Sequence, residues 1–195
     1  EVKYLTQANR RKVYVANNTI NFEDFPAIDE SREAIKREFN IPFEKVVLSV
    51  GRMDVGGQRK KIDHLVEVFR RISQPVAGLV IVGAGVSQEL QARMNRENTI
   101  YLGEIYDAKN VQISKIFRMA DLFCIPGHVG LGLVQAFHFG LPVVTEEGLQ
   151  PPEIHYLRDG WNGYLVPEND IDALQMRIEH LLRNDGVRRA FSRNA

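Results

Sequence analysis

The sequence has little of what marks several protein classes. Its 195 residues include one cysteine, Cys124, which cannot form an internal disulfide, and this usage fits a reducing compartment. No apolar run approaches the roughly 18 residues that a membrane-spanning helix needs, and no signal peptide is visible. Basic and acidic side chains number 25 each. That balance argues against nucleic-acid binding, which usually needs a basic domain. We therefore expect a cytoplasmic protein with no nucleic-acid partner.

Several chemical signatures are also missing. The Walker phosphate-binding pattern is absent, and Gly83-Ala84-Gly85 lacks the third glycine of a dinucleotide fingerprint, because position 88 is Gln88. No cluster of cysteine and histidine suggests zinc. No pair of carboxylates stands out in the way that hydrolytic glycosidases require. We therefore expect neither a metal nor a bound cofactor.

Apolar and amphipathic segments alternate along most of the chain. The segments 45–50 and 77–82 are apolar without polar alternation, which is typical of strands buried on both faces. The pattern predicts strands over 12–16, 45–50, 77–82, 99–102, 121–125, 141–145 and 163–166, and helices over 31–39, 62–72, 87–95, 111–119, 131–139 and 170–183 and from 185 onward. One helical turn is expected at 153–157, and 21–30 is expected to be a loop. Strands that alternate with helices predict an α/β domain, a parallel sheet covered on both faces.

The central stretch, residues 126–144, joins a predicted strand to a glycine-rich loop, a short helix and the next strand. N–H groups in the first turn of a helix have no helical partner, and glycine lets a phosphate approach the backbone closely. Two interpretations remain open, an anion site or a plain crossover whose glycines serve tight turns. His128 lies inside this loop, and whether it contacts a polar ligand is equally open.

A basic loop follows the first apolar strand. Arg52 comes directly after that strand, and Lys60 lies at the start of the next helix. An arginine fork and a lysine point charge at one strand end suit a diphosphate. The alternative is a solvated basic loop without a ligand.

Other polar and aromatic residues carry weaker signals. His64, His138 and His180 lie on predicted helices, and we interpret them as surface or packing residues. Three glutamates, at positions 146, 147 and 153, follow a strand without an identifiable partner. Trp161 and Tyr164 flank a glycine turn, where packing beneath the loop is favoured over sugar stacking.

A series of short motifs follows in order along the chain. The motifs are Val47-Leu-Ser-Val-Gly-Arg52, Lys60 with Ile62-Asp-His-Leu-Val-Glu-Val-Phe69, Val80-Ile-Val-Gly-Ala-Gly85, Ile100-Tyr-Leu-Gly103, Ala120-Asp-Leu-Phe-Cys-Ile-Pro126, Gly140-Leu-Pro-Val-Val144 and Asp159-Gly-Trp-Asn-Gly-Tyr-Leu-Val166. Together they resemble the C-terminal domain of retaining GT-B glycosyltransferases of the group 1 type. Each motif is modest alone, but the series covers nearly the whole chain.

The resemblance implies a fold, a reaction and partners. The fold is a single Rossmann-like domain over 1–195, the C-terminal half of a GT-B fold. The reaction is transfer of a sugar from a nucleoside-diphosphate-sugar, such as a UDP- or GDP-sugar, to an acceptor with retention of configuration. The sequence would then be a piece of a longer chain whose N-terminal domain binds the acceptor. A peripheral contact with the cytoplasmic membrane face, through that domain, is left open.

The resemblance also assigns roles to residues. It implies diphosphate binding by Arg52, Lys60, Gly130 and Leu131, sugar or ribose binding by Gly127, His128, Val129 and Gln135, and base binding by Gly103, Glu104 and Ile105.

This chain departs from the family pattern in its central loop. The family usually carries two glutamates eight positions apart, and here those positions are Gly127 and Gln135. Glu153 resembles a segment of a variant subgroup and is a candidate for the carboxylate. The departure keeps a second function open, a degenerate domain that binds a nucleotide or sugar without transfer.

Overall fold

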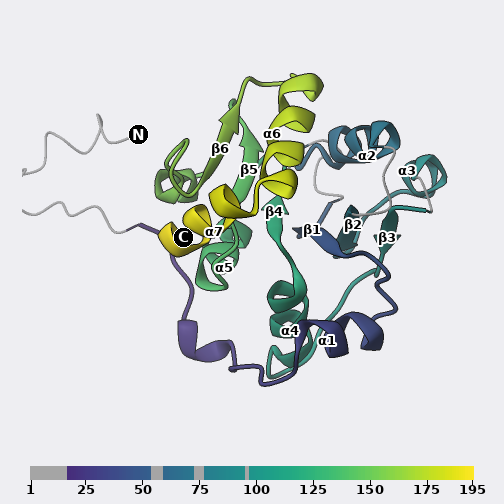
Figure 1. The fold of residues 1–195 in the computed structure, drawn as a ribbon, viewed down its shortest axis with the longest axis vertical. Coiled ribbons are helices and arrows are strands. Elements are labelled where there is room, and N and C mark those ends of the chain that lie inside the picture. The colour runs from purple at the N-terminus through teal and green to yellow at the C-terminus, as the bar shows by residue number, and fades with distance from the viewer. Residues whose placement is uncertain (1–16, 54–58, 73–76, 95–96) are drawn as a thin grey trace, which may run out of the picture.

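The computed structural model describes residues 17–53, 59–72, 77–94 and 97–195, and Figure 1 shows their arrangement. Six parallel strands form one sheet in the order β3-β2-β1-β4-β5-β6. The strands are β1 (Lys45–Val50), β2 (Ala77–Val82), β3 (Thr99–Tyr101), β4 (Leu122–Cys124), β5 (Val143–Glu146) and β6 (Gly163–Val166). This arrangement confirms the predicted parallel α/β sheet.

The centre of the sheet is its most apolar part. β1 and β2 pair in register along their full length, from Lys45 opposite Ala77 to Val50 opposite Val82. All six residues of β2 are buried, as are the four inner residues of β1. Such continuous burial is possible because helices cover both faces of a parallel sheet.

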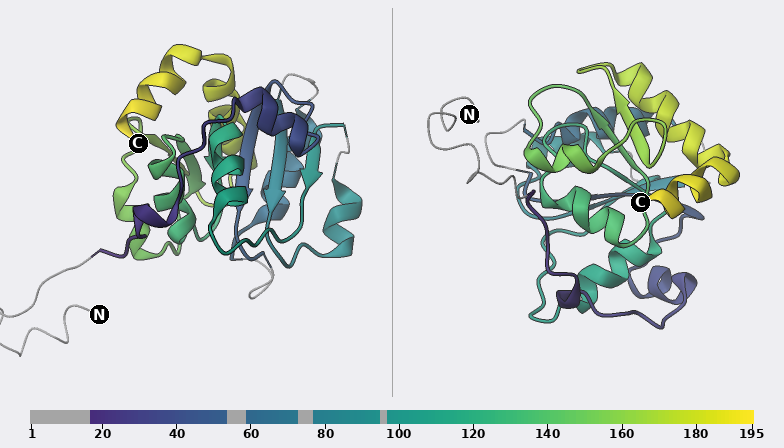
Figure 2. Two further views of the ribbon diagram at one scale, coloured as in Figure 1. Left: turned by 90° about the horizontal axis from the view of Figure 1, so that it is seen from below. Right: turned by 90° about the vertical axis from the view of Figure 1, so that its left-hand side faces the viewer.

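The helices form a layer on each face, and Figure 2 shows the sheet between them. Strand side chains alternate between two apolar clusters, one formed with α2, α6 and α7 and the other with α1, α4 and α5. The α-helices are α1 (Arg32–Glu38), α2 (Ile62–Arg71), α3 (Gln88–Arg93), α4 (Val111–Met119), α5 (Leu131–His138), α6 (Ile171–Arg183) and α7 (Asp185–Asn194), and two short 3-10 helices are η3 (Phe22–Asp24) and η4 (Pro152–Tyr156).

Local side-chain chemistry explains where three of the helices begin. Ser31, Ser87 and Asp170 each precede a helix, and each side chain accepts a hydrogen bond from a backbone N–H three residues later. Such caps satisfy N–H groups that have no partner within the helix. The predicted starts of α1, α3 and α6 are therefore confirmed.

Some predicted boundaries differ from the structure. The strand expected at 121–125 is shortened to β4, and the one expected at 141–145 begins later, as β5. The loop expected at 21–30 contains η3, where Asn21 accepts a hydrogen bond from the Glu23 N–H. The strand expected at 12–16 lies outside the described residues.

The order of the strands creates one switch point. After β1 the chain adds β2 and β3 on one side, then crosses back and adds β4, β5 and β6 on the other. β1 and β4 are therefore neighbours whose following loops diverge. In open α/β sheets, ligands bind outside the carboxyl ends of the strands at such a point.

Candidate functional site

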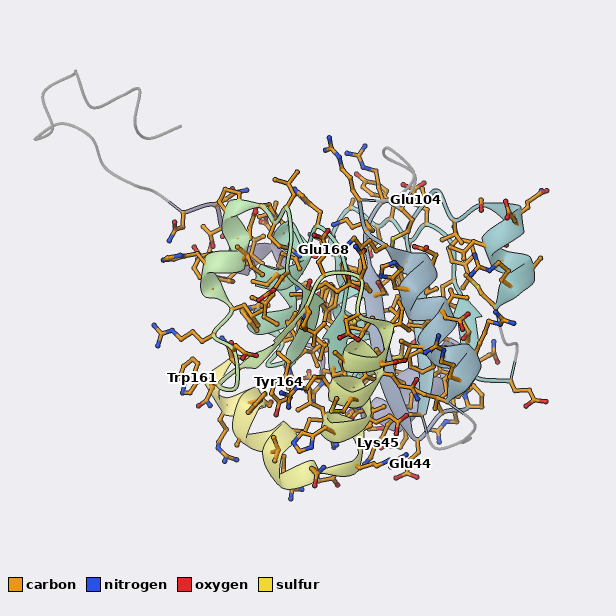
Figure 3. The ribbon with its side chains drawn as sticks, turned by 90° about the horizontal axis from the view of Figure 1, so that it is seen from above. Glu44, Lys45, Glu104, Trp161, Tyr164 and Glu168 are labelled. Carbon is orange, nitrogen blue, oxygen red and sulfur yellow. The ribbon has the colours of Figure 1, made fainter. Side chains whose placement is uncertain are left out.

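The two ends of the sheet carry different residues. Figure 3 shows Glu104, which comes shortly after β3, and Glu168, which comes shortly after β6, towards one end of the domain. Glu44 and Lys45, at the start of β1, lie towards the opposite end. The residues that the sequence assigns to a ligand follow the carboxyl ends of the strands or lie in the loop and helix after β4. We call the group of Gly51, Arg52, Lys60 and the loop 127–131 the Lys60 site.

Helix α5 begins at the switch point with an open N-terminus. Its N-cap, Gly130, has φ +59° and ψ −158°, a conformation that favours glycine, and it gives no side-chain cap. A Cβ on Gly132 would lie 3.1 Å from Phe123 and 3.5 Å from the Val50 carbonyl, so the helix packs closely over β4 and the end of β1. The uncapped N–H groups and the helix dipole give positive potential there.

The segment 59–60 is bridged to the central loop by backbone hydrogen bonds. The N–H of Gly127 donates to the Lys60 carbonyl at 3.0 Å, and the N–H of His128 donates to the Arg59 carbonyl at 2.6 Å. A Cβ on Gly127 would lie only 1.9 Å from that Arg59 carbonyl oxygen. Glycine at position 127 is therefore required by close backbone approach, and no side chain fits there without movement of the bridge.

The bridge places the ammonium of Lys60 beside α5. Its Nζ donates to the carbonyls of His128, at 2.5 Å, and Val129, at 3.2 Å. A Cβ on Gly130 would lie 3.6 Å from the same Nζ, and one on Gly51 would lie 3.7 Å from it. Burial lowers the pKa of Lys60, and the nearby charge of Glu153 opposes that shift. A cation and an open helix N-terminus thus converge at one place.

Gln150 fixes the central loop from the other side. Its Nε2 donates to the Gly127 carbonyl at 2.9 Å and the Glu146 carbonyl at 2.8 Å, and its Oε1 accepts from the Val129 N–H at 3.1 Å. Because one amide side chain bonds both flanks of His128, the loop has a defined shape before any ligand binds. Sequence reasoning missed this residue, because nothing in its local pattern marks it.

His128 is half-buried in this loop. Burial lowers its pKa, and the charges of Lys60 and Arg59 lower it further, so the neutral ring is favoured. A cavity of about 210 Å³ lies beside the loop and is lined by Arg59, Lys61, Gly127, His128, Glu147, Leu149, Gln150 and Glu168.

An ion cluster forms next to the Lys60 site. We call it the Glu146 cluster, made of Lys61, His64, Glu146, Glu168 and Asn169. Fully buried Glu146 accepts from Lys61 Nζ at 3.0 Å, from the Asn169 N–H at 2.9 Å, and pairs with His64 Nδ1 at 2.6 Å. Lys61 also donates to Glu168 and Asn169, each at 2.9 Å. All three N–H groups of its ammonium therefore have partners.

The pairing within the cluster shifts several pKa values. The hydrogen bond that His64 makes to the Glu146 carboxylate raises the pKa of His64. Burial alone would raise the pKa of Glu146, but the bonds from His64, Asn169 and Lys61 outweigh it and lower the pKa. The interpretation of His64 as a surface or packing residue was wrong, since it belongs to this ion cluster. His138 does pack, stacked on Phe22 with ring centroids 5.2 Å apart.

The remaining predicted residues follow β1 and β3 or lie in α5. Arg52 is exposed directly after Gly51, and Glu104 is exposed after β3. Ile105 packs partly against the apolar cluster beneath α4 and α5. Gln135, in α5, is half-buried, and among the described residues its side-chain amide makes no hydrogen bond. Their roles in binding remain predictions.

Gly83 has a structural reason for being glycine. Its φ is +129°, and a Cβ there would lie 1.9 Å from the Gly51 carbonyl oxygen. The N–H of Gly51 bonds the Val82 carbonyl, and the N–H of Met53 bonds the Ala84 carbonyl at 2.8 Å. The loops after β1 and β2 are thereby joined. Their close approach explains why glycine is needed at position 83, and a dinucleotide-binding role is not needed to explain it.

The described part of the chain contains no group of three or more side chains that could together ligate a metal ion. Within those same residues, no helix has the length and apolar character to cross a bilayer. Trp161 is largely exposed, whereas Tyr164 is buried, so packing beneath the turn holds for Tyr164 alone.

The fold class of this chain is a Rossmann-like α/β domain, of the kind that forms one half of a GT-B fold. The order of the strands and the loops at the switch point define it. The chain belongs to the glycosyl transferases group 1 family, whose model matches residues 31–195. It is 32% identical over 155 residues to a phosphatidyl-myo-inositol mannosyltransferase of Mycobacterium leprae (strain TN), covering 75% of this chain and 40% of that protein. The chain therefore spans less than half the length of this relative.

Solved structures show the same fold. WaaG, a glycosyltransferase involved in lipopolysaccharide biosynthesis, aligns with a TM-score of 0.77 at 20% identity, over 99% of this chain and 54% of that chain. Anabaena HepE, in complex with UDP and glucose, aligns with a TM-score of 0.72 at 16% identity, again over 99% and 54%. These likenesses confirm the Rossmann-like, GT-B-type fold.

Proposed function

We propose that this chain is the donor-binding domain of a retaining glycosyltransferase and that it holds a nucleoside-diphosphate-sugar at the Lys60 site. One observation carries the proposal, the Lys60 ammonium beside the uncapped N-terminus of α5. The ammonium of Lys60 has three N–H groups, and two of them donate to the carbonyls of His128 and Val129. Within the described part of the chain, the third N–H group is free to donate to a phosphate oxygen. A helix N-terminus supplies the remaining N–H donors for an anion.

The rest of the donor is assigned around this diphosphate. Arg52, exposed at the end of β1, would add a guanidinium to the phosphates. Gln135 would bond the ribose, and the backbone of 103–105 would contact the base. HepE, which has the same fold, is in complex with UDP and glucose, and this supports a nucleotide-sugar as the ligand of this chain. The mannosyltransferase relative supports a hexose as the transferred group.

The chemistry that these residues supply is positioning and charge stabilisation. As the sugar leaves, negative charge grows on the diphosphate, and a fixed cation and fixed N–H groups stabilise that charge without reorganisation. We propose that transfer needs no metal. We further propose that an N-terminal domain of a longer chain binds the acceptor. The protein would act at the cytoplasmic side of a membrane.

Calorimetric titration with UDP and GDP tests the site. Lys60→Ala and Arg52→Ala should each weaken diphosphate binding by about 1.5–3 kcal/mol, the range for hydrogen bonds to charged groups. Lys36→Ala is a matched control, because Lys36 Nζ also bonds a backbone carbonyl, that of Glu44, at the opposite end of the sheet. Arg118→Ala, on the exposed side of α4, controls for Arg52. Unchanged affinity in both site variants would contradict the proposal.

Turnover decides between transfer and mere binding. The second candidate function, a binding module without transfer, is favoured by Gly127, where close contact with Arg59 excludes a carboxylate side chain. We expect this chain alone to bind nucleotide but transfer nothing, and a full-length protein with its N-terminal domain to turn over at least one nucleotide-sugar. A full-length protein that binds nucleotide-sugars and transfers none of them would establish the binding module.

A further inference from the structure

Glu153 is a buried acidic residue with an unused hydrogen-bond acceptor. It lies in η4 with 5% of its surface exposed. Its Oε1 accepts from Asn18 Nδ2 at 2.7 Å, whereas its Oε2 is buried and has no partner among the described residues. Buried polar atoms are nearly always hydrogen-bonded, so an exception needs an explanation. A ligand that donates a hydrogen bond to Oε2 is one.

The fold brings Glu153 to the Lys60 site. Gln150 bonds the loop 127–129, and Pro151 follows it directly into η4, which packs against α5. Ile154, the next residue after Glu153, packs on the apolar cluster that contains Val129. The charge of Glu153 acts on both Lys60 and His128, since it raises the pKa of each against the larger effect of burial. The carboxylate therefore lies close to the cation and to the central loop.

Two other acidic side chains near this loop are paired within the domain, and a third, Glu147, is exposed. Glu146 is held by Lys61 and His64, and Glu168 is paired with Lys61. A side chain at position 127 is excluded by the Arg59 carbonyl. Among the residues that the structure describes here, Glu153 is the buried carboxylate with an oxygen left over.

We propose that Glu153 is a specificity-determining residue whose Oε2 accepts a hydrogen bond from a hydroxyl of the donor sugar. This inference rests on the proposed function. A phosphate is bound by donors, which Lys60 and α5 provide, but a sugar hydroxyl is best bound by a charged acceptor. A site built around a buried acceptor discriminates against a sugar that lacks the matching hydroxyl, because the acceptor is then left unpaired.

The test separates the sugar from the nucleotide. Affinities for UDP, GDP, UDP-glucose and GDP-mannose are measured by calorimetry on the full-length protein that carries this domain. The sugar increment is the ratio of nucleotide-sugar affinity to nucleotide affinity. Glu153→Gln should lower this increment about tenfold, in the range for a hydrogen bond to a charged group, and should not lower the affinity for the nucleotide alone, because it removes a negative charge near Lys60. The same measurement is made with nucleotide-sugars that each lack one sugar hydroxyl. One of them should bind the unmutated protein more weakly than the parent donor does, and Glu153→Gln should not weaken its binding further.

Two matched variants identify a merely structural role. Glu44→Gln removes an exposed charge at the opposite end of the sheet and should keep the increment. Asn18→Ala removes the hydrogen bond to Oε1 but retains the carboxylate, and it should keep the increment as well. Equal losses in Asn18→Ala and Glu153→Gln would show that the pair only holds η4 in place, and would overturn the inference.

Failure of the inference differs from failure of the proposed function. A protein that binds nucleotides through Lys60 but shows no sugar increment, or an increment that survives Glu153→Gln, contradicts the inference alone. A protein that binds none of the four probes contradicts both.

Discussion

Two neighbouring lysines, Lys60 and Lys61, differ in how completely their ammonium groups are hydrogen-bonded within the domain. Lys61, in the Glu146 cluster, donates all three of its N–H groups to partners within the domain. Lys60, one residue earlier, donates to two backbone carbonyls and lies beside an uncapped helix. Burial lowers the pKa of both lysines, but the bonds to Glu168 and Glu146 outweigh it at Lys61 and raise its pKa.

The difference separates a charge that is fully paired within the domain from one that keeps, among the described residues, a free hydrogen-bond donor. A fully paired buried cluster stabilises one arrangement of the chain and has no capacity left for a ligand. A site that keeps a donor at Lys60 and an acceptor at Glu153 has that capacity and loses stability for it. Substitutions in the Glu146 cluster should therefore change folding, and substitutions at the Lys60 site should change binding.

The largest expected effect is on stability, from Glu146→Ala. The substitution leaves Lys61 and His64 without their buried partner, and we expect the free energy of unfolding to fall by roughly 3–5 kcal/mol. Urea denaturation followed by circular dichroism measures it. Glu147→Ala, at the exposed next position, should change stability by no more than about 0.5 kcal/mol. Similar losses in the two variants would mean that the cluster does not stabilise the fold.

A smaller effect, on binding, is expected from Gln135. Its amide both donates and accepts, so it can serve ribose hydroxyls without a charge. Gln135→Ala should cost about 0.5–1.5 kcal/mol of nucleotide affinity, the contribution of a neutral hydrogen bond, with little loss of stability. Gln135→Glu should bind equally or more tightly, since a charged acceptor makes the stronger bond. Calorimetry and melting temperatures are measured for both variants.

The contrary outcome for Gln135 is a structural one. A large loss of melting temperature in Gln135→Glu, together with unchanged affinity in Gln135→Ala, would show that the residue belongs to the core and that the ribose contact lies elsewhere.

The smallest effect is a pH dependence of stability from His64. The bond to Glu146 raises its pKa in the folded chain above the ordinary value of 6.5. The folded state thus holds the proton more tightly than the unfolded state. The stability from protonated His64 is complete below about pH 6.5 and is lost as the pH rises through the raised pKa. Urea denaturation should show this decline in the unmutated chain and a flatter profile in His64→Gln. Parallel profiles would assign the decline to other groups.

The sequence alone determined the elements and the edge of the sheet at which the candidate ligand-binding residues lie. Apolar runs such as β1 and β2 need no distant information, because continuous burial selects for them locally. The caps at Ser31, Ser87 and Asp170 act over three residues, so their signal is local as well. Lys60 and the α5 N-terminus could be placed together because carboxyl ends of parallel strands share one edge.

Only the tertiary structure decided which charged groups are fully paired and which keep a free donor or acceptor. His64 and Glu146 are 82 residues apart in sequence, and Asn18 and Glu153 are 135 apart, so no local pattern records either contact. The same holds for Gly127, whose lack of a side chain follows from a backbone carbonyl at Arg59. Lys60 and Lys61 are the same residue type at adjacent positions. Their different partners arise from the elements packed on either side of them, because burial and hydrogen bonding depend on neighbours in space.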